Sequence, residues 1–111
     1  MRSGVALLLV GLSLLLAASA AAAVKRTAFT SVVPAGDDAS LTVQVAPTSR
    51  CTIKVVYSTG PSRARGLGAK TGGKIIWRWR VGSNTKPGRW PVTVDCGKAG
   101  KLTVYLRVRA S

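Results

Sequence analysis

The chain has 111 residues, of which 17 are Lys or Arg, three are acidic and none is His, so its formal net charge is +14 at pH 7. The acidic residues are Asp37 and Asp38, which follow a Pro-Ala-Gly turn, and Asp95, which falls on an outward strand face. Because the common general bases and metal ligands are missing or scattered, we expect no catalysis, no metal site and no other cofactor. A chain this cationic attracts polyanions such as wall polymers, acidic polysaccharides or nucleic acid.

The first 23 residues have the layout of an export signal. Arg2 supplies a positive start, residues 5–16 form an apolar run, and small side chains offer peptidase sites within residues 20–24. We therefore expect a signal peptide over residues 1–23, followed by one secreted or envelope-associated domain over residues 24–111. An uncleaved membrane anchor is the alternative, because the apolar and alanine-rich stretch reaches about 20 residues.

The rest of the chain alternates apolar and polar residues with a period of two, which predicts short β-strands. Turns rich in Gly, Pro, Ser and Asp separate them. The predicted strands cover residues 28–33, 39–46, 51–57, 74–81, 89–96 and 101–109. Six strands at this spacing are typical of a sandwich or a barrel.

Two cysteines allow the pairing of the third and fifth strands to be tested. In an exported protein we expect a disulfide between Cys51 and Cys96 rather than two free thiols. Placed opposite each other in antiparallel strands, they align apolar residues on one face: Ile53 with Val94, Val55 with Val92, and Tyr57 with Trp90. A slip of one residue would turn a whole strand over, so this register is specific.

The last strand is predicted to continue this sheet through a hairpin at residues 97–100. That hairpin sets Leu102, Val104, Leu106 and Val108 beside Cys96, Val94, Val92 and Trp90, respectively. The first, second and fourth strands then supply the opposing sheet. The predicted core consists of Ile53, Val55, Trp77, Trp79, Trp90, Val92, Val94, Val104 and Leu106.

Two segments resemble bacterial extracellular immunoglobulin-like and fibronectin-III-like domains. Residues 87–94 read Pro-Gly-Arg-Trp-Pro-Val-Thr-Val, which follows the Pro-Gly-x-aromatic-x-Val-x-Val pattern of such domains, and residues 77–81 resemble the strand before it in small actinobacterial-type secreted proteins. The resemblance covers most of residues 29–109. It implies an all-β, two-sheet immunoglobulin-like sandwich of about six to seven strands with one disulfide. Such domains serve as spacers, adhesins or polymer-binding modules, and the fold does not choose among these roles.

Basic residues gather in the longest turn and on the strand after it. Residues 58–73 are predicted to form a flexible loop, and long loops in small domains are often functional. The predicted polyanion-binding residues are Arg63, Arg65, Lys70, Lys74, Arg78 and Arg80. A second outward face carries Tyr105, Arg107 and Arg109, a combination that stacks on bases or sugars. Ordinary solvated strand faces are the alternative explanation for both.

The sequence therefore predicts a non-enzymatic, secreted, strongly basic binding or structural module. Its expected partners are anionic polymers of the cell envelope or the surroundings, bound unselectively. The alternatives are a cationic membrane-active defence protein and an inhibitor of a secreted enzyme that acts through the long loop. A membrane-active protein needs an exposed apolar face, and here the apolar face of each strand is required for the core.

Overall fold

The computed structural model describes residues 23–111, so the expected signal peptide, apart from Ala23, lies outside the described residues. These residues form β-strands and one short 3-10 helix. In chain order the elements are β1 (Lys25–Phe29), β2 (Val32–Pro34), β3 (Asp38–Gln44), β4 (Arg50–Tyr57), β5 (Gly60–Pro61), β6 (Lys70–Thr71), β7 (Lys74–Arg80), β8 (Gly88–Asp95), η2 (Gly97–Ala99) and β9 (Lys101–Arg109). Over this part of the chain, no helix has the length and apolar character needed to cross a membrane.

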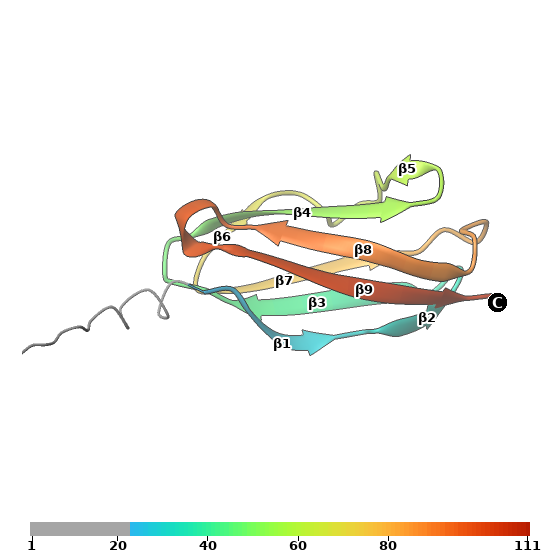
Figure 1. Cartoon of the computed structure of the whole chain (residues 1–111), viewed down its shortest axis with the longest axis horizontal. Helices are drawn as coiled ribbons and strands as arrows, with labels where there is room; N and C mark the ends of the chain where they lie inside the picture. The colour runs from blue at the N-terminus through green and yellow to red at the C-terminus, as the bar shows by residue number, and fades with distance from the viewer. Residues whose placement is uncertain (1–22) are drawn as a thin grey trace, which may run out of the picture.

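The strands form two sheets that pack face to face (Figure 1). One sheet has the order β1-β3-β7, and the other has the order β2-β9-β8-β4-β5, with β6 paired to another part of β4. This arrangement confirms the predicted all-β, two-sheet immunoglobulin-like sandwich. There are more strands than predicted because β5 and β6 are additional two-residue strands and because the first predicted strand is divided.

The first predicted strand, residues 28–33, is wrong in its bounds because the chain changes sheets within it. β1 pairs antiparallel with β3, whereas β2 pairs parallel with β9. The backbone N–H of Thr30 donates to Ser40 in the first sheet, and the carbonyl of Ser31 accepts from Arg107 in the second. The register of β1 also shifts between Arg26 and Ala28, and such irregular edge strands discourage pairing with other molecules.

The pairing deduced from the cysteines is confirmed. Cys51 and Cys96 form a disulfide with their Cα atoms 4.1 Å apart. The strands β4 and β8 are antiparallel, with Ile53 opposite Val94 and Val55 opposite Val92. Beyond this ladder, the rings of Tyr57 and Trp90 meet edge to face with their centroids 6.5 Å apart.

The register of β9 against β8 differs by two residues from the prediction. Leu102 lies opposite Val94 rather than Cys96, and Leu106 lies opposite Trp90 rather than Val92. The turn is tighter than the predicted register requires, because the N–H of Cys96 donates to the carbonyl of Gly100 (2.9 Å) and only η2 lies between these two residues. A shift of two keeps every side chain on its predicted face, since side chains alternate with a period of two.

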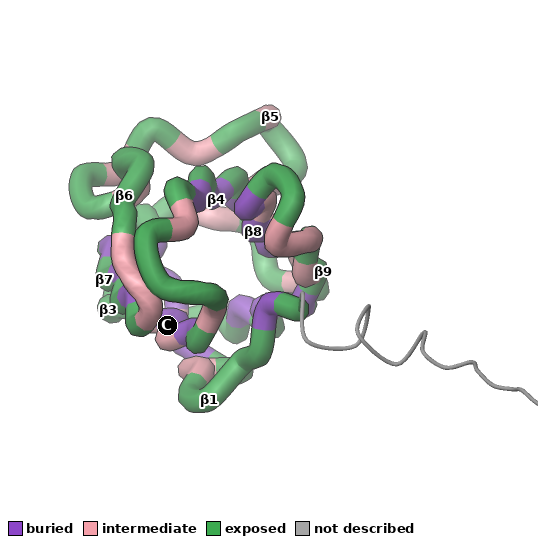
Figure 2. The backbone as a smooth tube through the Cα atoms, turned by 90° about the vertical axis from the view of Figure 1, so that its left-hand side faces the viewer, coloured by how far each residue is buried: buried purple, intermediate pink, exposed green. Residues whose placement is uncertain are grey.

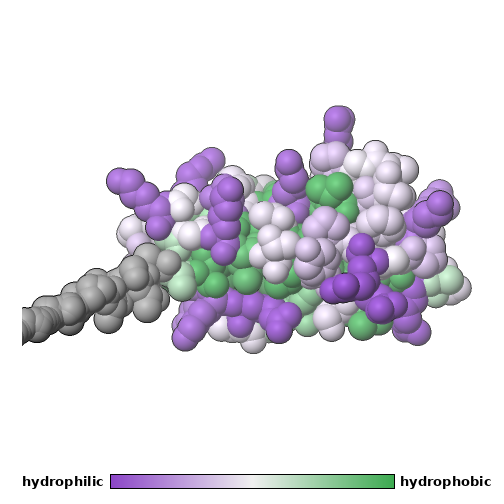
Figure 3. Space-filling view, in the orientation of Figure 1, coloured by the Kyte–Doolittle hydropathy of each residue, from purple (hydrophilic) through white to green (hydrophobic). Residues whose placement is uncertain are grey.

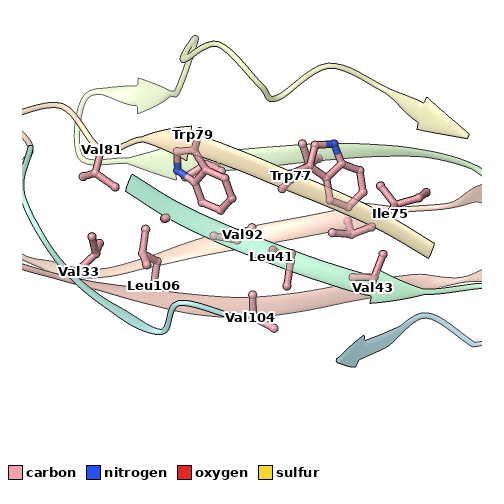
Figure 4. Packing of buried hydrophobic residues seen from close by; sticks show 14 of the residues in the cluster. Val33, Leu41, Val43, Ile75, Trp77, Trp79, Val81, Val92, Val104 and Leu106 are labelled. Carbon is pink, nitrogen blue, oxygen red and sulfur yellow. The ribbon is translucent and has the colours of Figure 1, made fainter. Parts of the chain in front are cut away.

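Inward side chains from both sheets fill the space between the layers (Figure 4). The indoles of Trp77 and Trp79, exposed by 0% and 2%, form its bulkiest part and project from β7 toward the other sheet. The predicted core residues that are buried are Ile53, Val55, Trp77, Trp79, Val92, Val94, Val104 and Leu106.

Trp90 is the exception, because it is only half-buried. Its indole N–H donates to the carbonyl of Lys86 (2.9 Å), and its ring lies against Gly88, where an added Cβ would stand 3.0 Å from the ring. Part of the indole therefore covers the turn before β8 instead of the core. Trp90 lies on the predicted face of β8, but it is near the end of the sandwich, where the core does not cover the whole ring.

Candidate polyanion-binding site

The outward face of β7 carries a row of cations. Lys74, Arg78 and Arg80 are exposed and alternate with the buried residues of the same strand. A strand rises about 3.3 Å per residue, which puts the Cα atoms of Arg78 and Arg80 about 7 Å apart. That separation is close to the screening length of about 8 Å in physiological salt, so their charges act together on a ligand.

The segment between β4 and β7 is bound to the sandwich over much of its length. β5 pairs with the end of β4, and β6 pairs with its beginning, so the intervening residues run back along the sandwich. Figure 2 shows this stretch passing along one side of the two sheets. It differs from the freely mobile loop that its Gly-rich, Ser-rich and Arg-rich composition predicts.

Three contacts hold this segment against β7. The buried indole of Trp77 donates its N–H to the carbonyl of Gly68 (2.9 Å), and the ammonium of Lys70 donates to the carbonyl of Ile76 (2.7 Å). The third contact is at Gly66, whose backbone lies directly against the backbone carbonyl of Arg78.

The φ of Gly66 is +94°, in the left-handed region. The Gly66 conformation is one that residues with a Cβ rarely adopt. We call residues 62–70, held in this way, the side segment.

The side segment brings most of the predicted cations to β7. Lys70 reaches β7 through its ammonium group, and Arg65 lines the same surface groove of ≈ 500 Å³ as Arg80. Arg63 is exposed, and no hydrogen bond or ion pair among the described residues connects its side chain to β7. The structure therefore brings together the other predicted cations, and we call Arg65, Lys70, Lys74, Arg78 and Arg80 the basic surface.

Lys25 also belongs to this face, although the sequence did not indicate it. In the three-stranded sheet Lys25 lies opposite Gln44, and Gln44 lies opposite Lys74. Two strand spacings of about 4.8 Å separate the two lysines. No pattern in the sequence could place Lys25 there, because β1 begins before the predicted strand and its register shifts at a bulge.

Acidic side chains do little to neutralise this charge. Asp38 pairs with Nε of Arg80 (3.2 Å), and Asp95 pairs with Lys101 (3.8 Å) and accepts the N–H of Gly97 (2.9 Å). Both ion pairs are exposed, and such pairs stabilise a fold by about 1 kcal/mol at most. Within residues 23–111, no group of three or more Cys, Asp, Glu or His side chains could hold a metal ion.

No protein-family model and no curated protein matches this chain. Three features of the described surface could bind a ligand: the basic surface, the groove beside it, and the outward face of the larger sheet.

The outward face of the larger sheet carries the second predicted set. Tyr105 is 50% exposed, and the guanidinium of Arg89 lies over its ring, 4.8 Å from the centroid. Arg107 lies directly opposite Arg89, and Arg109 ends the same strand. Because Arg89 already covers one face of the Tyr105 ring, that face is not free to stack on a ligand. Figure 3 shows hydrophilic side chains projecting from the molecule with apolar surface between them.

Proposed function

We propose that this chain is an exported, non-enzymatic module that binds anionic polymers of the cell envelope or its surroundings through the basic surface. The main support is the clustering of Lys74, Arg78 and Arg80 on one strand face, with Arg65 and Lys70 brought alongside by the side segment. Only Asp38 forms an ion pair with this cluster among the described residues. Closely spaced cations attract a polyanion more strongly than the same charges dispersed.

Export is supported by the disulfide and by the layout of the N-terminal residues. Disulfides form and persist in oxidising compartments, and Cys51 and Cys96 are paired with no free cysteine among the described residues. The N-terminal sequence adds a positive start, an apolar run and small residues at the expected cleavage region.

Polymer binding fits the surface better than membrane disruption does. The large apolar side chains exposed in residues 23–111 are Val32, Ile76 and Tyr105. Ile76 lies on the smaller sheet, whereas Val32 and Tyr105 lie on the larger one. A membrane-active surface requires a continuous apolar face beside its cations, and these three side chains do not form one.

The proposal is tested by comparing two triple variants of residues 24–111. Arg65, Lys74 and Arg78 are changed to Gln in the first variant, and the dispersed residues Arg50, Lys98 and Arg109 are changed to Gln in the second. Affinity for polygalacturonate is measured between about 50 and about 200 mM salt, where counterion release makes the logarithm of affinity fall linearly with the logarithm of salt concentration. We expect the first variant to flatten this slope by about 2–3, one for each lost contact, and the second to leave it nearly unchanged.

Equal losses of polygalacturonate affinity in the two variants would show that binding depends on the total charge and not on the basic surface. Binding that does not depend on salt would contradict the electrostatic mechanism itself. Leakage from anionic vesicles, measured in parallel, would favour a membrane-active protein instead.

A further inference from the structure

A groove of ≈ 500 Å³ lies beside the basic surface, where β4 and β7 end. Several separate segments contribute to it: the last residue of β4, the start of the side segment, the last residue of β7 and the turn after β7. Its lining residues are Tyr57, Ser62, Ala64, Arg65, Arg80, Gly82 and Thr85. A second hollow of ≈ 400 Å³ shares Tyr57, Gly82 and Thr85 with it, so the two hollows adjoin.

The hydroxyl of Tyr57 is a positioned hydrogen-bond donor at this groove. The hydroxyl oxygen accepts a hydrogen bond from the indole N–H of Trp79 (3.2 Å). Because an indole nitrogen can only donate, this bond does not use the hydrogen of the Tyr57 hydroxyl. The hydroxyl hydrogen of Tyr57 has no acceptor among the described residues. Burial raises the pKa of Tyr57, so the phenol stays protonated near neutral pH. The edge-to-face contact with Trp90 helps to hold the ring in place.

Two guanidinium groups line the same groove. Nε of Arg80 is bonded to Asp38, and no other hydrogen bond of the Arg80 guanidinium is found within residues 23–111. Arg65 is exposed and forms no ion pair in the described part of the chain. A guanidinium presents a planar set of donors that matches a carboxylate. The hydroxyls of Ser62 and Thr85 add groups that can bond a polyhydroxylated ligand.

We propose that this groove binds one acidic sugar unit of an anionic polysaccharide. The sugar carboxylate binds Arg65 and Arg80, and the sugar hydroxyls bind the hydroxyls of Tyr57, Ser62 and Thr85. The groove lies within the range of about 300–1,000 Å³ that is usual for small-molecule sites. This inference rests on the proposed function and names the class of polymer that the basic surface would bind.

Short ligands test the groove without the multiple contacts of a long polymer. Residues 24–111, which contain the whole described core, are titrated with trigalacturonate, with uncharged maltotriose and with tripolyphosphate. We expect trigalacturonate to shift the NMR signal of the Trp79 indole N–H, because that group is bonded to Tyr57. Maltotriose, which lacks the carboxylates, is expected to bind at least tenfold more weakly.

Matched variants locate the site. Arg65→Gln is expected to weaken trigalacturonate binding about tenfold, as the loss of a hydrogen bond to a charged group does, whereas Arg63→Gln changes it less than twofold. Tyr57→Phe removes one hydroxyl and is expected to weaken binding about fivefold, whereas Tyr105→Phe makes the same change on the other sheet and has no effect. Near-UV circular dichroism verifies that each variant is folded.

Equal affinity for trigalacturonate in Arg65→Gln and Arg63→Gln would overturn the inference. Tripolyphosphate binding that equals trigalacturonate binding and depends equally on Arg65 would overturn the acidic-sugar assignment in favour of a general oxyanion site. If the polymer still requires the basic surface while the short ligand ignores Arg65, the groove inference fails and the proposed function stands. If the short ligand requires Arg65 while the polymer ignores the basic surface, the proposed function fails instead.

Discussion

Gly66 controls how closely the side segment approaches β7. Its φ of +94° and its contact with the Arg78 carbonyl leave no room for a Cβ. Gly66→Ala is therefore expected to lower the free energy of unfolding by about 1–3 kcal/mol or more, through backbone strain and displacement of the segment. Gly68→Ala is the matched control, since a Cβ there meets nothing within 4 Å, and its effect is expected within about 0.5 kcal/mol. Urea unfolding measures both, and equal effects would contradict the role assigned to Gly66.

The three tryptophans differ in burial, and this difference has a measurable consequence. Trp77 is fully buried, so Trp77→Ala is expected to cost about 3–5 kcal/mol in the free energy of unfolding. Trp90→Ala is expected to cost less, because its ring is half-buried. In acrylamide quenching, Trp90→Phe should remove most of the quenchable emission. Equal quenching of all three indoles would contradict this order.

Tyr57 gives the fold a dependence on alkaline pH. Burial raises its pKa above the unfolded value of about 10, so folding favours the neutral phenol. The stability that this group contributes is present below about pH 10 and is lost as the pH rises through the pKa of the folded state. We expect the midpoint of urea unfolding to fall less steeply above pH 10 in Tyr57→Phe than in the unmodified chain. Tyr105→Phe is the control and should keep the original slope.

At the scale of elements, the disulfide joins the beginning of β4 to Cys96, the residue after β8, across a sequence separation of 45 residues. Replacing both cysteines with Ala is expected to lower the free energy of unfolding by about 4 kcal/mol on the chain-entropy estimate. The fold should persist, because the β4–β8 ladder also contains the apolar pairs Ile53–Val94 and Val55–Val92. Urea unfolding measures the loss in the free energy of unfolding, and near-UV circular dichroism of the tryptophans checks that the fold persists. Loss of the near-UV signal in native buffer would show that the ladder depends on the disulfide.

The strands with clear alternation were predicted almost to the residue. The predicted strand at residues 101–109 coincides with β9, and those at residues 51–57 and 74–81 differ from β4 and β7 by one residue at one end. Residues 28–33 were not predicted correctly because their division between two sheets depends on partners far along the chain. The β9 register was not predicted correctly because the hydrogen bonds within the turn set the length of the turn, and the strand pattern does not reveal them.

At the scale of the whole molecule, the dominant feature is uncompensated positive charge. Residues 23–111 contain only two ion pairs, and both are exposed. Raising the salt concentration from about 10 to about 150 mM shortens the screening length from about 30 to about 8 Å and weakens the repulsion among the cations. We expect the melting temperature to rise by about 4–8 °C for each kcal/mol of repulsion removed. The Arg65, Lys74 and Arg78 triple variant should show a smaller rise, and a melting temperature independent of salt would contradict this explanation.

The sequence alone was sufficient to predict the layered β fold, the disulfide and the inward face of nearly every strand. These features follow from a period of two and from one cross-link that aligns two strands, so they can be recognised in short stretches of chain. Only the tertiary structure decided that the side segment lies against β7, that Lys25 joins the basic face, and that Tyr57, Arg65 and Arg80 share a groove. Each of these depends on which segments meet in the folded chain, such as Lys25 with Gln44 or Tyr57 with Trp79, and the alternation within a single strand does not encode such contacts.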